Sequence, residues 1–207
     1  MPARLPRSFF ARPAPEVARE LLGHVLVRSG PETGRLAARI VEVEAYEQDD
    51  PASHAFRGQT ARNAVMFGRA GHLYVYFTYG MHWCMNVVTG GLGRGSAVLL
   101  RAGEPIEGIH EMSARRSGRP IAELCAGPAR WTQAFGVSRG ENGTDLVRTG
   151  QLWIERGSPV ATRDVLVTER IGISVGRGRP WRFVDSTSGS LSRPVPRPVT
   201  ARRRAQR

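Results

Sequence analysis

Lysine is absent from this chain of 207 residues, and all thirty of its basic residues are arginine. The chain therefore has no lysine amine that could form a Schiff base with a sugar aldehyde. The two cysteines, Cys84 and Cys125, are far apart and belong to no Cys-x-x-Cys motif, so we expect buried small residues rather than a disulfide or a metal site. The five histidines show no metal-ligand spacing either. We expect neither a metal ion nor a cofactor.

Long apolar runs are also missing. No stretch approaches eighteen apolar residues, and the first residues, Met-Pro-Ala-Arg-Leu-Pro-Arg, lack the apolar core of a signal peptide. We therefore expect a reduced intracellular compartment, the cytoplasm, with no membrane partner. Acidic residues are few, and eighteen of them against thirty arginines leave a net charge of +12. Such an excess predicts a polyanionic partner.

The densest aromatic stretch runs from residue 73 to residue 88. Its aromatic and β-branched first half predicts a strand, Tyr79 and the glycine after it predict a tight turn, and the remainder predicts the return strand. Tyr74 and Tyr76 share one strand face, whereas Tyr79 sits at the turn, where a large aromatic has little core to enter. The hairpin suits a protein that wedges into a base stack, and a folded core would suit the same tyrosines nearly as well.

Apolar periodicity and turn residues place the other elements. Helices are expected near residues 16–22, 60–67, 104–115 and 128–136, and strands near residues 24–28, 35–46, 97–101, 152–155, 165–167 and 181–184. From residue 186 onward the chain is rich in Ser and Gly, then in Pro and Arg, with no apolar periodicity. We predict one domain over residues 1–185 and a disordered basic tail over residues 186–207.

Glu44 is the first candidate for chemistry. It lies near the end of a strand, with Tyr46 and Glu42 on the same face, and a carboxylate in this place could activate a water. The local pattern alone favours a simpler explanation, in which these are solvent-facing strand residues. Arg101 ends an apolar strand, so it either meets a buried carboxylate or phosphate, or stays at the rim with its stem on apolar surface. The sequence supports both alternatives equally.

His54 and Asn86 are weaker candidates. His54 lies in an expected loop, where it could take part in acid/base chemistry or stacking, although a structural loop histidine is the commoner outcome. Asn86 lies in an otherwise apolar return strand, so its amide needs partners from a neighbouring strand or from a polar pocket.

Several motifs occur together and in order along the chain. They are Val41-Glu-Val-Glu-Ala-Tyr46, His54 in its loop, Thr60-Ala-Arg-Asn63, Leu73-Tyr-Val-Tyr-Phe-Thr-Tyr-Gly-Met81, Cys84-Met-Asn86, Val98-Leu-Leu-Arg-Ala102 with Glu104-Pro105, and Leu124-Cys-Ala-Gly-Pro128. This set resembles the alkyladenine (3-methyladenine) DNA glycosylase family in its bacterial form. The resemblance covers about residues 14–183 and implies a single α+β domain, in which short helices flank a curved antiparallel β-sheet with a protruding β-hairpin.

The resemblance also implies catalytic and pocket residues. Glu44 matches the family's general base, which deprotonates a water, and Arg101 matches the arginine that helps to hold that water. The residues that match the family's base-binding pocket are Tyr46, His54 and Tyr76, which sandwich the flipped base, Tyr74, which hydrogen-bonds near the carboxylate, and Asn86, which disfavours the 2-amino group of guanine.

The implied activity is that of a monofunctional DNA glycosylase in base excision repair. Such an enzyme flips an alkylated or deaminated purine out of double-stranded DNA, hydrolyses the N-glycosidic bond and leaves an abasic site. Tyr79 and Met81 match the hairpin-tip residues that fill the gap in the duplex, and the enzyme is expected to be a monomer. Because lysine is absent and no Pro-Glu pair follows Met1, we predict hydrolysis without strand cleavage.

Two other functions fit parts of the sequence. A non-catalytic nucleic-acid-binding protein could use the same basic surface and aromatic hairpin, although Glu44 near phosphates would weaken pure binding. A carbohydrate glycosidase could use Glu42 and Glu44 as paired carboxylates, but a net charge of +12 has no purpose for a neutral sugar. The chain departs from the family pattern after Phe183, where residues 185–193 replace an Asn-Pro-aromatic-Val-Ser segment.

Overall fold

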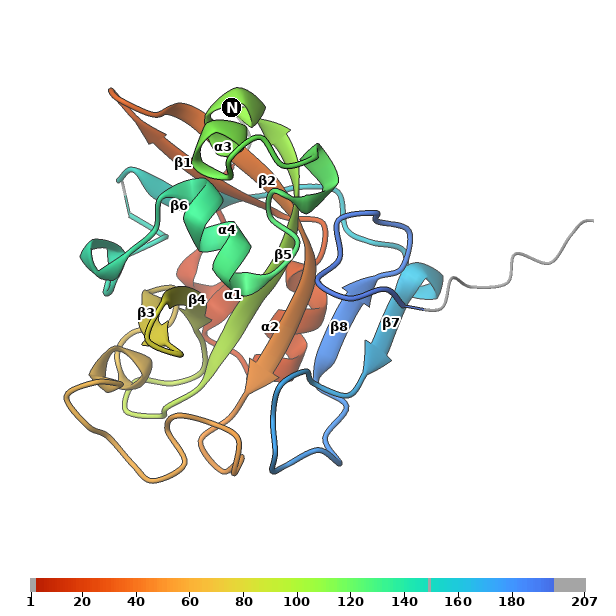
Figure 1. Cartoon of the computed structure of the whole chain (residues 1–207). Helices are drawn as coiled ribbons and strands as arrows, with labels where there is room; N and C mark the ends of the chain where they lie inside the picture. Colours follow the sequence, from red (N-terminus) through yellow and green to blue (C-terminus); the bar gives the residue numbers. More distant parts are fainter. Residues whose placement is uncertain (1–2, 149, 196–207) are drawn as a thin grey trace, which may run out of the picture.

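The computed structural model describes residues 3–148 and 150–195. Within these residues one eight-stranded antiparallel sheet curls through the molecule (Figure 1), in the order β3-β4-β5-β2-β1-β6, with β8 added to β2 and β7 to β8. The strands are β1 Val25–Gly30, β2 Gly34–Tyr46, β3 Leu73–Thr78, β4 His82–Val88, β5 Ala97–Glu107, β6 Leu152–Glu155, β7 Val165–Thr168 and β8 Arg182–Asp185. This sheet confirms the expected α+β class with a curved antiparallel sheet.

β2 is the longest strand and has neighbours on both edges. β5 pairs with one edge of β2 from Ala37 to Tyr46. On the opposite edge, β1 pairs with the first half of β2, and β8 pairs with Glu42 to Glu44. The register between β2 and β5 passes over Val41 on β2 and Arg101 on β5, which is an irregularity of the β-bulge type. Bulges bend a strand and re-aim its side chains. The second half of β2 is therefore an interior strand with a local distortion.

The helices are short. They are α1 Arg7–Phe10, α2 Ala14–Leu21, α3 Ile109–Arg115 and α4 Pro128–Phe135, with 3-10 turns at Ala64–Phe67, Ile121–Glu123, Arg139–Glu141 and Thr162–Asp164. α2 packs on β2 and α4 packs on β4 and β5 (Figure 1). Proline in the first turn begins both α2 and α4, where its missing N–H costs no helical hydrogen bond. None of the helices in the described part of the chain is long and apolar enough to cross a membrane.

Two of the expected helices differ from the structure. The helix expected from residue 104 begins only at Ile109, because Glu104 and Pro105 still belong to β5 and lie opposite β2. An ion pair of 2.6 Å between Arg39 and Glu104 reinforces this pairing, so the cross-strand contact outweighs the local helix signal. The helix expected over residues 60–67 is reduced to a turn and the 3-10 segment from residue 64.

Asn63 explains the shorter element. Its side-chain amide donates to the carbonyl oxygens of His54, at 2.8 Å, and of Gly58, at 3.1 Å, while its amide oxygen accepts from the N–H of Thr60 at 2.6 Å. Such side-chain to backbone bonds compete with a helix. Asn63 therefore ties the loop that carries His54 instead of starting a regular helix.

The chain keeps contact with the domain beyond residue 185. Ser186 and Ser190 are buried, and Ser192 hydrogen-bonds to Glu42. The tail expected from residue 186 therefore begins with a segment held by polar contacts, which apolar periodicity could not reveal. Residues 196–207 of that expected tail lie outside the described residues.

The apolar core has one main cluster and two small ones, of which the smaller contains Val27, Ala37 and Trp153. The main cluster joins the inner face of the sheet to α2 and α4 and includes Val43, Leu100 and Trp131. The second cluster contains Tyr74, Phe67 and Met66, with Tyr76 packed against it. It anchors the base of the β3–β4 hairpin beside β2 and β5.

Candidate active site

A pocket of about 310 Å³ lies between β2, β5 and the β3–β4 hairpin. Its volume is at the lower end of the range for small-ligand pockets. It brings together eight of the nine residues proposed from the sequence, and the ninth, Met81, lies at the exposed hairpin tip. The eight are Glu44, Tyr46, His54, Tyr74, Tyr76, Tyr79, Asn86 and Arg101.

Glu44 is completely buried, which corrects the simpler expectation of a solvent-facing strand residue. Glu42 is buried as well, because β5 and β8 cover both edges of β2 at this point and arginines from both strands lie over its carboxylates. A carboxylate is rarely buried unless it is paired. Alternation along β2 gave the shared face correctly but carried no information on what covers that face.

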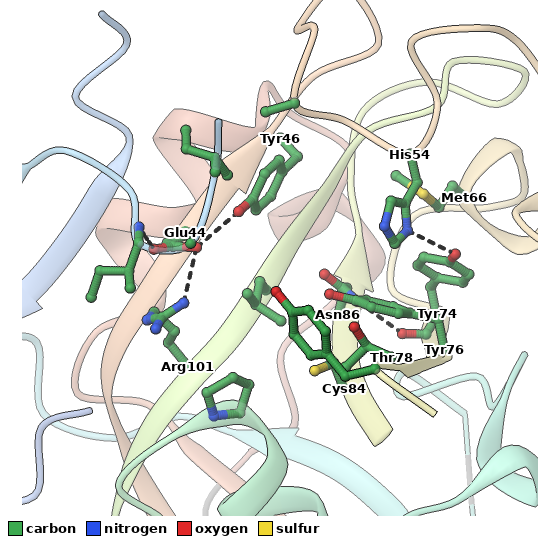
Figure 2. Close-up of a pocket in the computed structure, with 17 residues that line it drawn as sticks. Glu44, Tyr46, His54, Met66, Tyr74, Tyr76, Thr78, Cys84, Asn86 and Arg101 are labelled. Carbon is green, nitrogen blue, oxygen red and sulfur yellow. Dashed lines mark hydrogen bonds and ion pairs between the residues drawn. The ribbon is translucent and has the colours of Figure 1, made fainter. Parts of the chain in front are cut away.

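Three donors hold the carboxylate of Glu44 (Figure 2). Its Oε1 accepts the backbone N–H of Ile171 at 2.7 Å, and its Oε2 accepts the hydroxyl of Tyr46 at 2.9 Å and Nη1 of Arg101 at 3.3 Å. An ionised carboxylate offers about four acceptor positions. These donors use three of them, so roughly one position remains for a water or substrate atom in the pocket.

Arg101 is buried and meets carboxylates, which settles the two alternatives that the sequence left open. Its Nε donates to Glu42 at 3.0 Å, and the same carboxylate oxygen accepts Nε of Arg182 at 2.8 Å. Arg101 is also the residue that the β2–β5 register passes over. The ion pairs offset the cost of burying its charge, and the bulge turns the side chain toward Glu42 and Glu44.

The opposite wall of the pocket is aromatic (Figure 2). Tyr74 and Tyr76 follow each other on one face of β3 and stack, with ring centroids 5.5 Å apart and an angle of 27°. The ring of His54 meets Tyr76 edge-on at 4.5 Å, and its Nδ1 lies 3.1 Å from the hydroxyl of Tyr74.

Burial keeps this wall uncharged. It lowers the pKa of His54, helped by the nearby positive charge of Arg62, and raises the pKa of Tyr74 to about 12. Burial also raises the pKa of Tyr76, with a smaller contribution from Cys84. Neutral rings present polarisable faces, which suit a flat aromatic ligand and a cationic one.

Tyr46 and Asn86 complete the pocket. Burial, with the adjacent carboxylate of Glu44, raises the pKa of the Tyr46 hydroxyl, so this group stays a hydrogen-bond donor. The amide of Asn86 donates to the carbonyl oxygen of Tyr74 on β3 at 3.1 Å and also lines the pocket. Both partners that the sequence left open for Asn86, a neighbouring strand and a polar pocket, are therefore present.

The hairpin tip is strained and exposed. Tyr79 and Gly80 have φ angles of 51° and 68° at the centre of a turn in which the N–H of Met81 donates to the carbonyl oxygen of Thr78 at 3.2 Å. Tyr79 to Met81 lie between the last paired residues of the hairpin, Thr78 and His82. For a non-glycine residue such a positive φ costs roughly 1–2 kcal/mol. Tyr79 is 81% exposed and Met81 is 66% exposed, so burial does not offset the strain. Strain of this kind gathers at functional sites.

Arg170 supports the site and was missed by the sequence analysis. It is fully buried, pairs with Asp50, and donates to the carbonyl oxygens of Ala45 at 3.0 Å and Gly176 at 3.1 Å. Its guanidinium lies over the ring of Tyr46, 4.7 Å from the centroid. The next residue, Ile171, supplies the amide that binds Glu44. The residues that follow Arg170 are rich in glycine and show no apolar periodicity, so the sequence carried no signal for its role.

No group of three or more His, Cys, Asp or Glu side chains in residues 3–148 and 150–195 is arranged to hold a metal ion. The two cysteines are free and buried. The pocket is lined by a hydrogen-bonded carboxylate, an arginine and neutral aromatic rings.

Comparison with known proteins fits this architecture. The family model described as methylpurine-DNA glycosylase matches residues 8–189. A protein of Carboxydothermus hydrogenoformans, named as an inferred 3-methyladenine DNA glycosylase, is 52% identical over 180 residues, covering 86% of this chain and 93% of that protein. Proteins of the same name from Streptomyces avermitilis and Methanocella arvoryzae are 53% and 47% identical, covering 86% and 93% of this chain and 86% and 97% of theirs. The chain belongs to the methylpurine-DNA glycosylase family.

Proposed function

We propose that the protein flips an alkylated or deaminated purine out of duplex DNA and hydrolyses its N-glycosidic bond with a water activated by Glu44. The observation that carries this proposal is the placement of Glu44. It is buried at one side of the pocket with one acceptor position unused, and neutral aromatic rings form the other side. The family name indicates methylated purines as the class of substrate.

Base binding would use the aromatic wall. The purine ring would lie between Tyr46 on β2 and the rings of His54 and Tyr76, with Tyr74 held in place by its contact with His54. Alkylation at N3 or N7 gives a purine a positive charge, which neutral aromatic faces attract. Asn86 lines the same pocket and would disfavour a base with an additional 2-amino group.

Bond cleavage would use Glu44 as a general base. The carboxylate takes a proton from the water, the water oxygen bonds to the anomeric carbon, and the C–N bond breaks with its electron pair going to the purine. An alkylated purine thereby loses its positive charge, whereas a neutral lesion needs protonation to leave. Arg101 would help to hold the water. A positioned base of this kind contributes about 10²–10⁴-fold to the rate.

Access to the base would depend on the hairpin tip. Extruding a base costs roughly a few kcal/mol of lost stacking and pairing. Tyr79 and Met81 are exposed apolar side chains on a narrow turn, as a wedge in the minor groove requires. The excess of arginine would supply phosphate contacts.

The site geometry does not support the alternative of a carbohydrate glycosidase that uses Glu42 and Glu44 as paired carboxylates. Both oxygens of Glu42 already accept hydrogen bonds, from Arg101, Arg182 and Ser192, and Glu42 does not line the pocket. A carbohydrate glycosidase needs two carboxylates that face one bond. Among the carboxylates of residues 3–148 and 150–195, Glu44 alone lines the pocket.

Single-turnover base release from a duplex with one hypoxanthine or ethenoadenine tests the proposal. We expect release by the wild type and none by Glu44→Gln, which should still bind the lesion. The product strand should break only after alkali, because no lysine is present to cleave it. Binding without release by the wild type, on these lesions and on methylated DNA, would instead identify a non-catalytic nucleic-acid-binding protein.

A further inference from the structure

Glu42 lies two residues before Glu44 on β2 and is enclosed by donors. Its Oε1 accepts Nε of Arg101 at 3.0 Å, Nε of Arg182 at 2.8 Å and the hydroxyl of Ser192 at 2.7 Å. Its Oε2 accepts the backbone N–H of Ser192 at 2.7 Å. The carboxylate is fully buried outside the pocket lining, so its contacts act on neighbouring side chains and not on a bound molecule.

Ser192 contacts both members of the Glu42–Arg101 ion pair. Its hydroxyl donates to Glu42 and accepts from Nε of Arg101 at 3.1 Å. The segment before it is anchored by polar contacts. Asp185 pairs with Arg39 at 2.6 Å and accepts the N–H of Thr187 at 3.0 Å, and the N–H of Ser186 donates to the carbonyl oxygen of Asp164 at 2.9 Å. The segment that follows β8 is thus anchored where it leaves the strand, and it brings Ser192 to Arg101 and Glu42.

This arrangement divides the arginine between two carboxylates. Nε of Arg101 is held by Glu42 and Ser192, and only Nη1 reaches Glu44, at 3.3 Å. An arginine that is free to turn favours a bidentate pair with one carboxylate, with N–O distances of about 2.7–2.9 Å. Such a pair with Glu44 would occupy the acceptor position that an attacking water needs.

We propose that Ser192 is a positioning residue, which holds Nε of Arg101 on Glu42 and so keeps one acceptor position of Glu44 open for the water. This inference rests on the proposed function, because it assigns Ser192 to the orientation of the same water site. Ser192 touches neither the water nor the base. It acts through Arg101.

The test compares Ser192→Ala and Ser192→Thr with the wild type in single-turnover base release from an ethenoadenine duplex at saturating protein. Ser192→Ala removes the hydroxyl from both partners, and we expect a rate about tenfold lower, the effect of losing one hydrogen bond to a charged group. Ser192→Thr keeps the hydroxyl and should restore the rate. The dissociation constant for the duplex should stay unchanged in both variants, because the effect lies in the bond-breaking step.

Ser188→Ala is the matched control. Ser188 lies in the same segment and accepts the N–H of Ser190 at 3.2 Å, so its loss disturbs the segment away from Glu42. We expect wild-type release from this variant. A wild-type rate in Ser192→Ala, an equal loss in Ser188→Ala, a failure of Ser192→Thr to restore the rate, or a loss confined to duplex binding would each overturn the positioning role.

Failure of the proposed function has a different signature. If the wild type itself releases no base, or if Glu44→Gln releases it at the wild-type rate, the hydrolytic role of Glu44 is refuted, and the role of Ser192 falls with it. If the wild type releases base, Glu44→Gln does not and Ser192→Ala equals the wild type, only the positioning role is refuted.

Discussion

The two walls of the pocket lie on different kinds of strand. Glu44 and Arg101 belong to β2 and β5, interior strands of the sheet whose side chains here are buried and paired. Tyr76 and Tyr79 belong to the β3–β4 hairpin, where β3 is an edge strand and the turn is exposed and strained. The difference indicates a division of labour. In the proposed function, the buried wall of β2 and β5 would hold the chemistry, and the protruding hairpin wall would handle the base and the duplex.

The largest effect on stability is expected at the buried Asp50–Arg170 ion pair, which supports the pocket wall that carries Glu44 and Arg101. Asp50→Asn leaves the fully buried Arg170 without its counter-charge, and losing one partner of a buried pair typically costs about 3–5 kcal/mol of unfolding free energy. Denaturant unfolding measures this loss. Asp49→Asn is the matched control, because the neighbouring pair with Arg179 is exposed and should contribute little. Equal losses in the two variants would contradict the supporting role of Arg170.

A change at the hairpin tip should separate duplex handling from chemistry. Tyr79→Ser removes the wedge, and if the wedge offsets roughly 2 kcal/mol of extrusion cost, base release from a duplex falls about 30-fold. Release from single-stranded DNA should change little. Single-turnover rates on both forms test this. Ile121→Ser, which alters an exposed apolar residue outside the pocket, serves as the control. Equal losses on duplex and single strand would rule out the wedge.

Sequence patterns predicted the aromatic hairpin wall better than the wall that carries Glu44 and Arg101. Period-two alternation and the Tyr-Gly turn gave the hairpin, its exposed tip and the shared face of Tyr74 and Tyr76. The same alternation placed Glu44 on a common face with Tyr46, yet burial there comes from β5 and β8, and β8 joins the sheet some 140 residues later in the chain. The resemblance to a glycosylase family supplied the candidate roles that local pattern could not.

Contacts made by irregular segments were not predictable in this way. The amide of Ile171 reaches Glu44 from a stretch with neither helix nor strand, and Ser192 reaches Glu42 from a segment with the composition of a tail. Backbone donors carry no sequence signal, because every residue except proline has one. A serine-rich segment likewise gives no periodicity, although its hydroxyls can anchor it.

The smallest predicted effect concerns pH and the aromatic wall. Burial lowers the pKa of His54 below its unfolded value of about 6.5, so the unfolded chain binds more protons than the folded one between the two pKa values. The contribution of His54 to stability therefore falls as the pH drops below about 6.5. His54→Gln should show a shallower loss of unfolding free energy between about pH 7 and pH 5 than the wild type.

Denaturant unfolding at several pH values measures this slope, the change of the unfolding free energy with pH. Burial also lowers the pKa of His24, so a slope should persist in the variant. The paired carboxylates Asp145, Glu155 and Asp185 have lowered pKa values, and their stabilisation is lost at more acidic pH. An identical slope in His54→Gln and the wild type would show that His54 is not held neutral by burial.

The central claim is that Glu44 takes the proton from the attacking water. The most direct measurement is single-turnover release of 7-methylguanine, whose fixed positive charge makes protonation of the leaving base unnecessary, by the wild type and by Glu44→Gln at saturating protein. We predict that Glu44→Gln releases the base about 10²–10⁴-fold more slowly, the contribution of a positioned general base, while its dissociation constant for the lesion duplex stays unchanged. Release by Glu44→Gln at the wild-type rate would contradict the account.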